Sequence, residues 1–177
     1  MRVIGGSARG RRIEAPPGRG TRPITDRAKE AIFNMLGSLG ALHDEARVLD
    51  LFAGSGSFGI ESLSRGAAHA TFVEMDRAAA RTLERNLDHL GFADRAEVLV
   101  RPAASALTAL TGGPPFDVAF CDPPYALDPW ADLLDRLPAP LVVGHAEHDI
   151  ELTEGWLELR RKTYGRSRIL IAERALP

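Results

Sequence analysis

The stretch that decides the fold is RVLDLFAGSGSFG, residues 47–59. It begins with an apolar run typical of a buried strand, continues through a glycine-rich turn and ends at the start of a helix. Gly54, Gly56 and Gly59 match the spacing G-x-G-x-x-G, in which glycine permits positive φ angles and close approach of the backbone to a ligand. A strand, a glycine turn and a helix in this order predict the first unit of a parallel α/β sheet.

The residues after this stretch alternate between strand-like and helix-like patterns. Short apolar runs predict strands, and apolar residues spaced three and four apart predict helices. We expect strands at residues 48–52, 70–74, 97–100, 116–121, 141–146, 157–162 and 168–172, and helices at 58–65, 77–90, 103–110 and 130–137. The alternation predicts an α/β fold with a doubly wound, mostly parallel seven-stranded sheet, and the turn at Tyr164-Gly165 adds an antiparallel C-terminal hairpin.

The first 24 residues differ in composition from the rest of the chain. They are rich in Gly, Arg and Pro, which predicts either a small hairpin or a flexible basic arm. Thr25 is a suitable N-cap and Asp26 suits a first helical turn, so a helix should begin there. The chain is therefore expected to consist of an N-terminal hairpin or arm at 1–24 and a main domain at 25–177.

Charged residues are segregated along the chain, although the net charge is only −2. Residues 1–30 hold eight basic and three acidic side chains, and residues 160–177 hold six basic and one acidic. The segment between them holds eight basic and 20 acidic side chains. An acidic body with two basic ends predicts that the ends bind a polyanion such as nucleic acid, although solvated, Arg-rich ends that only keep the protein soluble would look the same.

The composition favours a soluble cytoplasmic protein. Apolar residues make up 45% of the chain, and no run approaches the roughly 18 apolar residues of a membrane span. The N-terminus lacks the apolar segment of a signal peptide. With Cys121 as the single cysteine no internal disulfide can form. No metal site is expected, because His145 and His148 are not accompanied by a cluster of further ligands.

Glu74 stands 20 residues after Gly54, at the end of the second expected strand. A carboxylate at this place accepts hydrogen bonds from ribose hydroxyls in nucleotide-binding folds, and ligands of such folds lie beyond the carboxyl ends of the strands. The pattern predicts a nucleoside cofactor. It leaves NAD and S-adenosylmethionine as alternatives, because both contain an adenosine ribose.

A second motif, Asp122-Pro123-Pro124-Tyr125, follows the fourth expected strand. The two prolines fix φ and remove two backbone donors, so acceptors dominate the polar groups of this loop. A carboxylate and a carbonyl together can accept both hydrogens of an exocyclic amine and so localise its lone pair toward an electrophilic methyl group. Tyr125 offers a flat face on which an unstacked base can lie. The loop therefore indicates methyl transfer to a nucleobase amine.

The two motifs together resemble the class I S-adenosylmethionine-dependent methyltransferases that modify exocyclic amines of nucleobases. The stretches RPITDRAKEAIFN (22–34), LDLFAGSGSFGIESLSRG (49–66) and YGRS (164–167) are similar to the RsmD family, which methylates N2 of a guanine in 16S ribosomal RNA. The similarity runs from about residue 2 to residue 172 and is most specific in residues 22–34. It implies a Rossmann-like methyltransferase fold with S-adenosylmethionine as cofactor.

The resemblance also implies roles for matching residues. Glu74 would hold the ribose and Met75 would lie beside the adenine, within a cofactor set of Asp50, Ala53, Gly54, Gly56, Glu74, Met75 and Thr25. Asp122 and the carbonyl of Pro123 would hold the guanine amine, with Tyr125 stacked on the base. RNA would be bound by Arg9, Arg11, Arg12 and Arg22. The partner would be 16S ribosomal RNA or the assembling small ribosomal subunit, and the enzyme would be a monomer.

The chain departs from the pattern after its third expected strand. Relatives often carry an acidic residue there that meets the adenine amine, whereas residues 100–104 read VRPAA, so backbone atoms are expected to make this contact. Three other functions stay open at this point. They are a DNA or RNA adenine-N6 methyltransferase, an NAD-dependent oxidoreductase that uses the glycines of 54–59, and an RNA-binding module without catalysis.

Overall fold

The computed structural model describes residues 1–17, 24–124 and 127–175. Every strand and helix expected from the sequence is present, with bounds that differ from the expected ones by at most two residues. In chain order the elements are α1 (Asp26–Ser38), β1 (Arg47–Leu51), α2 (Ser57–Ser64), β2 (His69–Val73), α3 (Arg77–Leu90), the short 3₁₀ helix η1 (Ala93–Arg95), β3 (Ala96–Leu99), α4 (Ala103–Leu110), β4 (Val118–Cys121), α5 (Trp130–Arg136), β5 (Leu141–Ala146), β6 (Trp156–Tyr164) and β7 (Ser167–Arg174).

The strands form one seven-stranded sheet in the order β3-β2-β1-β4-β5-β7-β6. β1 to β5 pair in parallel, and β7 pairs antiparallel with both β5 and β6. The predicted mixed sheet with its antiparallel C-terminal hairpin is therefore confirmed. β2 and β3 are added on one side of β1, and β4 and β5 on the other, so the order in which strands are added reverses between β1 and β4. A sheet of this kind binds ligands at the carboxyl ends of the two strands that flank this point of reversal.

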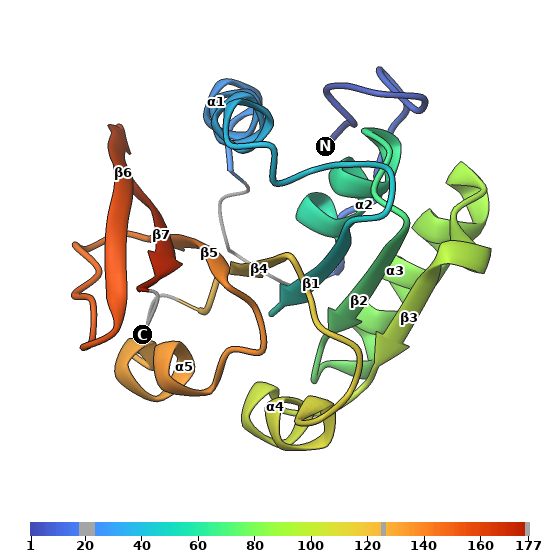
Figure 1. The fold of residues 1–177 in the computed structure, drawn as a ribbon. Coiled ribbons are helices and arrows are strands. Elements are labelled where there is room, and N and C mark those ends of the chain that lie inside the picture. The colour runs from blue at the N-terminus through green and yellow to red at the C-terminus, as the bar shows by residue number, and fades with distance from the viewer. Residues whose placement is uncertain (18–23, 125–126, 176–177) are drawn as a thin grey trace.

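Helices cover both faces of the sheet (Figure 1). α1, α2 and α3 share a core with the side chains on one face, and α4 and α5 share a second core with the other face. β1 shows how a buried parallel strand serves both layers, because Val48 belongs to the first core and Leu49 to the second.

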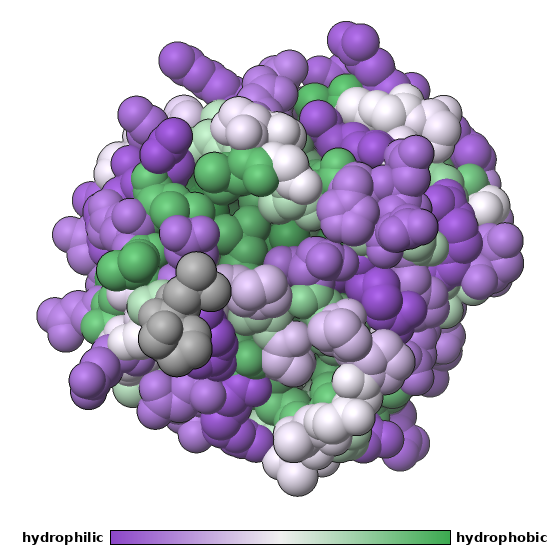
Figure 2. Space-filling view, viewed as in Figure 1, coloured by the Kyte–Doolittle hydropathy of each residue, from purple (hydrophilic) through white to green (hydrophobic). Residues whose placement is uncertain are grey.

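A mostly apolar hollow lies at the end of the sheet that faces the viewer, below the position of α1, as Figure 2 shows. Its walls come from the loop after α1, the start of β5 and the C-terminal hairpin, and include Leu39, Leu141, Leu157 and Leu159. This hollow lies at the end of the sheet opposite the carboxyl ends of β1 and β4. In the part of the chain that the structure describes, no helix is long and apolar enough to cross a membrane.

The N-terminal residues form a hairpin, one of the two forms expected for this segment. Arg2 and Arg12 make an antiparallel bridge, and the Val3 N–H donates to the Arg11 carbonyl at 2.9 Å. The hairpin is anchored because Val3 and Ile13 are buried in the same core as α1 to α3. Its apolar side chains thus hold a basic segment against the main domain.

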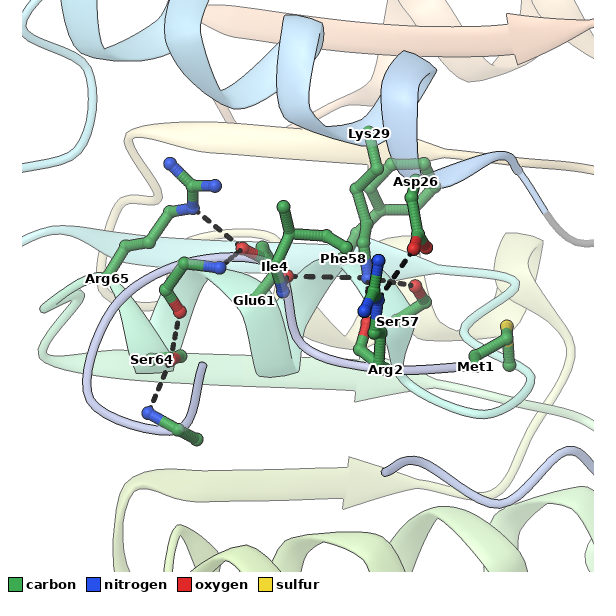
Figure 3. A network of polar contacts seen from close by, with 12 residues as sticks. Met1, Arg2, Ile4, Asp26, Lys29, Ser57, Phe58, Glu61, Ser64 and Arg65 are labelled. Atoms are coloured by element: carbon green, nitrogen blue, oxygen red, sulfur yellow. Dashed lines mark hydrogen bonds and ion pairs between the residues drawn. The ribbon is translucent and has the colours of Figure 1, made fainter. Parts of the chain in front are cut away.

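A buried ion pair joins this hairpin, α1 and α2 (Figure 3). Nζ of Lys29 lies 3.4 Å from Oε2 of Glu61, and the two side chains are 2% and 0% exposed. Glu61 also accepts hydrogen bonds from the N–H groups of Ile4 and Gly5 and from Nε of Arg65, each at 2.8 Å. Burial lowers the pKa of Lys29, opposed by the nearby charge of Glu61. One carboxylate therefore satisfies donors from three segments of the chain.

We expect Glu61→Ala to destabilise the protein by about 3–5 kcal/mol, because the change leaves the buried Lys29 ammonium group without its opposite charge and two backbone N–H groups without their acceptor. The free energy of unfolding in urea measures this loss. Glu84→Ala is the matched control, since Glu84 is exposed on α3 and its loss should cost no more than about 0.5 kcal/mol. Equal losses in the two variants would contradict a stabilising role for the Glu61 network.

Candidate functional site

Three acidic side chains lie at the carboxyl ends of neighbouring strands. Asp50 is on β1, Glu74 follows β2 and Asp122 follows β4. Side chains alternate between the faces of a strand, so each acid continues the row of the apolar residue two positions before it. Those apolar residues, Val48 for β1 among them, belong to the core that is covered by α1, α2 and α3. The three carboxylates therefore face the same side of the sheet at its point of reversal.

The glycine loop between β1 and α2 has the backbone that its residues predict. Gly54 and Gly56 have φ angles of 56° and 82°, which favour glycine. Phe52 also has a positive φ, 63°, a conformation that costs a residue with a side chain about 1–3 kcal/mol. Ala53 donates to the Val73 carbonyl at 2.9 Å, so the loop continues the pairing of β1 with β2. Strain of this kind is characteristic of loops that bind ligands.

The second and third glycines of the motif are needed for packing inside the protein. A Cβ atom on Gly56 would lie 2.3 Å from Cδ1 of Leu83, and one on Gly59 would lie 2.2 Å from Cε1 of Phe72. Both positions are therefore closed to larger residues because α2 packs closely on α3 and β2. Sequence reasoning had attributed Gly56 to close approach of a ligand, and the structure gives it this internal reason as well.

Asp50 is buried beneath the start of α2. Its Oδ2 accepts the N–H of Gly59 at 2.9 Å, and this bond replaces the side-chain cap that Gly56, the N-cap residue of α2, cannot provide. Burial raises the pKa of Asp50 to about 8, and the charges of Asp122 and Glu74 act in the same direction. The charges of Asp122 and Glu74 thus disfavour ionisation of Asp50, and a cation bound at this end of the sheet would favour it.

Glu74 holds the glycine loop in place. Its Oε2 accepts the N–H of Gly54 at 2.9 Å, and its Oε1 accepts the N–H of Asp76 at 2.8 Å. The residue is 2% exposed, yet it borders a small pocket beside the loop. The pocket is lined by Phe52, Val73, Glu74, Met75, Arg101, Ala103, Pro124 and Leu127. Met75, expected beside an adenine, is 66% exposed there, and the segment after β3 that departs from the family pattern forms part of the wall.

Asp122 has a partner that sequence reasoning missed. Its Oδ1 lies 2.9 Å from Nδ1 of His145 on β5, and Nε2 of the same histidine lies 2.9 Å from Oγ of Ser167 on β7. The sequence indicated only that His145 ends a strand. The missing signal was strand register, because Cys121 pairs with Gly144 and the next residues of the two strands are therefore neighbours.

The other predicted residues occupy several places. Thr25 caps α1, accepting the Ala28 N–H at 3.2 Å, and Pro123 is buried beside Asp122. Arg9, Arg11 and Arg12 are exposed on the hairpin, where the Arg11 guanidinium donates to the carbonyls of His89 and Leu90 at the end of α3. Arg22 and Tyr125 lie outside the described residues. Within the described ranges no group of three or more His, Cys, Asp or Glu residues is arranged to hold a metal ion.

The raised pKa of Asp50 predicts how stability depends on pH. Between about pH 4 and pH 8 the folded protein retains a proton that the unfolded chain has released, so this residue's contribution to stability falls as pH rises, by up to about 1.4 kcal/mol per pH unit. Asp50→Asn keeps an acceptor for Gly59 and should flatten the dependence, as measured by urea unfolding across this range. Asp94→Asn, an exposed control on η1, should leave it unchanged. Parallel curves for the parent and Asp50→Asn would refute the assignment.

Comparison with known proteins places this geometry in a family. The model of the family described as "Conserved hypothetical protein 95" matches residues 1–173. The chain is 42% identical over 185 residues to "Putative rRNA methyltransferase YlbH" of Bacillus subtilis, an alignment that covers 97% of each chain. It is 37% identical over 175 residues to "Ribosomal RNA small subunit methyltransferase D" of Haemophilus influenzae, covering 93% of this chain and 89% of the relative.

Its fold is similar to a solved structure from Escherichia coli, "Putative methyltransferase yhhF". The TM-score is 0.83 at 36% sequence identity, and the match covers 98% of this chain and 97% of the other. The sheet order, the glycine loop and the acidic strand ends are thus found in a chain that matches this family over nearly its full length. The protein belongs to the family described as conserved hypothetical protein 95, which is the RsmD family that its motifs resemble.

Proposed function

We propose that this protein transfers a methyl group from S-adenosylmethionine to the exocyclic N2 amine of a guanine in 16S ribosomal RNA. The observation that carries the proposal is the placement of Asp122 at the end of β4, next to a glycine loop and two further carboxylates at the ends of β1 and β2. The glycine loop suits a bound nucleoside, and Asp122 suits a bound amine. The reaction needs both, and both lie where the strand order reverses between β1 and β4.

The charge of the site favours S-adenosylmethionine over NAD. S-adenosylmethionine brings a sulfonium and an ammonium cation, whereas NAD brings a diphosphate with negative charge. Asp50, Glu74 and Asp122 lie at the carboxyl ends of neighbouring strands, and the pKa of Asp50 is raised by burial and, secondarily, by its acidic neighbours. A cation stabilises these carboxylates and a diphosphate would be repelled by them. The site thus supports methyl transfer rather than hydride transfer.

The residues of the chain act on the amine in two ways. The carboxylate of Asp122 and the carbonyl of Pro123 accept the two N–H groups, so the nitrogen lone pair points away from the base and toward the methyl donor. S-adenosylmethionine would supply the electrophilic methyl group, whose bond to sulfur breaks as its bond to nitrogen forms, leaving S-adenosylhomocysteine. After transfer the nitrogen carries a positive charge that Asp122 stabilises until the proton leaves to solvent. Because the amine lies at a base edge, the guanine must be unpaired or turned out of its stack.

The RNA side of the proposal rests on charge and on relatives. Arg9 and Arg12 are exposed on the anchored hairpin, and the two relatives named above carry ribosomal RNA in their names. Naked 16S ribosomal RNA or the assembling small subunit is the proposed partner of a protein that acts in the cytoplasm as a monomer. Arg11 is the weakest member of the predicted RNA set, because its guanidinium already binds carbonyls of α3.

Cofactor binding tests the ribose assignment. We expect Glu74→Gln to weaken S-adenosylmethionine binding by about 1–3 kcal/mol, since a neutral amide replaces a charged acceptor while its oxygen still receives one loop N–H. Isothermal titration calorimetry measures the change, with NADH as the competing ligand class. Unchanged affinity in the variant would overturn the ribose assignment, and preferential binding of NADH would overturn the methyltransferase proposal.

Single-turnover methyl transfer tests the chemistry. We expect Asp122→Ala to lower the rate by about 10²–10³, the scale for loss of one preorganised polar contact, with far smaller effects on RNA and cofactor affinity. The substrate is small-subunit RNA from cells that lack the enzyme, and mass spectrometry of its nucleosides identifies the product. N2-methylguanosine is the expected product, whereas N6-methyladenosine would replace this proposal with the adenine-directed alternative. A parental rate in Asp122→Ala would contradict the mechanism.

A further inference from the structure

A buried histidine lies behind the proposed catalytic carboxylate and takes no part in the chemistry derived so far. The His145 side chain is 2% exposed, while that of Asp122 is 34% exposed. Both ring nitrogens of His145 lie 2.9 Å from a polar side-chain oxygen, one on Asp122 and one on Ser167. An imidazole bonded at both nitrogens and enclosed by strands is held in one orientation.

The register of three neighbouring strands produces this arrangement. β4 and β5 run parallel and pair Cys121 with Gly144, so Asp122 and His145 follow side by side. β5 and β7 run antiparallel and pair His145 with Ile169, which leaves Ser167 two residues further on the same face. The three polar side chains therefore form a row across the carboxyl end of the sheet, where the rows below them are apolar.

The Asp122 carboxylate sets the direction of the hydrogen bond at Nδ1, and the bond at Nε2 follows from it for a neutral ring. An ionised carboxylate can only accept, so Nδ1–H of His145 donates to Asp122. The neutral ring then has its acceptor at Nε2, which receives the hydroxyl hydrogen of Ser167. With Oδ1 engaged by the ring, the Asp122 carboxylate is fixed in rotation and Oδ2 is left to accept the amine of a substrate.

We propose that His145 is a positioning residue that orients the Asp122 carboxylate for the target amine, and that Ser167 holds His145 in the tautomer with hydrogen on Nδ1. The inference rests on the proposed function, because it assigns Asp122 to the amine. His145 acts through Asp122 and touches neither base nor cofactor. Its effect belongs to the rate of methyl transfer, since a misplaced acceptor weakens the transition state more than the bound ground state.

A matched pair of variants separates orientation from packing. The side-chain nitrogen of Asn occupies about the place of Nδ1, so His145→Asn keeps a donor toward Asp122. That of Gln occupies about the place of Nε2, so His145→Gln keeps only the contact toward Ser167. We expect His145→Gln to lower the single-turnover rate by about 10- to 100-fold and His145→Asn to restore most of that loss. KM for RNA should change by less than about twofold in both, because ground-state binding is unaffected.

Three results would overturn the inference. They are equal rates in the two variants, a loss confined to KM, and a His145 ring that carries its hydrogen on Nε2. The last is measured in the parent protein by ¹⁵N NMR of the imidazole, which depends neither on activity nor on the folding of a variant.

His43→Gln is the control, because His43 lies 3.7 Å from Asp117 at the opposite end of β4 and should not affect the rate. A parent that methylates no ribosomal RNA, yet shows the Nδ1–H tautomer, would contradict the proposed function and leave the His145–Asp122 geometry supported.

Discussion

The hydrogen bond from the Gly59 N–H to the buried Asp50 carboxyl group connects β1 to α2, the helix that follows it, and fixes the glycine loop between them. A buried carboxyl group is costly unless it is hydrogen-bonded, and an N–H group at the start of α2 meets that need. The helix can approach only because Gly59 lacks a side chain where Phe72 packs. One electrostatic requirement thus determines where α2 begins and how the glycine loop turns.

The same requirement recurs at each polar group near the carboxyl end of the sheet. Glu74 is satisfied by N–H groups of the glycine loop and of Asp76, and Asp122 by the ring of His145. These carboxylates are consequently fixed in position before any ligand arrives, which is the condition for electrostatic catalysis. Burial is the main cause of the raised pKa of Asp50, and the charges of Asp122 and Glu74 add to it, so this end of the sheet favours a cation over an anion.

The hairpin at the N-terminus shows how a basic segment is kept on an acidic protein. Glu61 on α2 accepts from Ile4 and Gly5 of the hairpin and pairs with Lys29 of α1. The hairpin is therefore held by buried contacts, and Arg9 and Arg12 stay exposed on it. Exposed ion pairs would stabilise an N-terminal arm much less than these buried contacts do, because water and salt screen exposed charges.

Local pattern was sufficient for the strands and helices, the mixed sheet and the two motifs of the site, since each is written in residues that are adjacent or regularly spaced. The G-x-G-x-x-G loop and Asp122-Pro123 are of this kind. Contacts between distant segments were beyond that reasoning. His145 stands 23 residues from Asp122 and meets it only because β4 and β5 pair in one register. Glu61 stands 57 residues from Ile4 and meets it only because the hairpin packs on α2. A histidine or glutamate in the sequence has no visible partner until the sheet is assembled, because burial and strand register choose that partner.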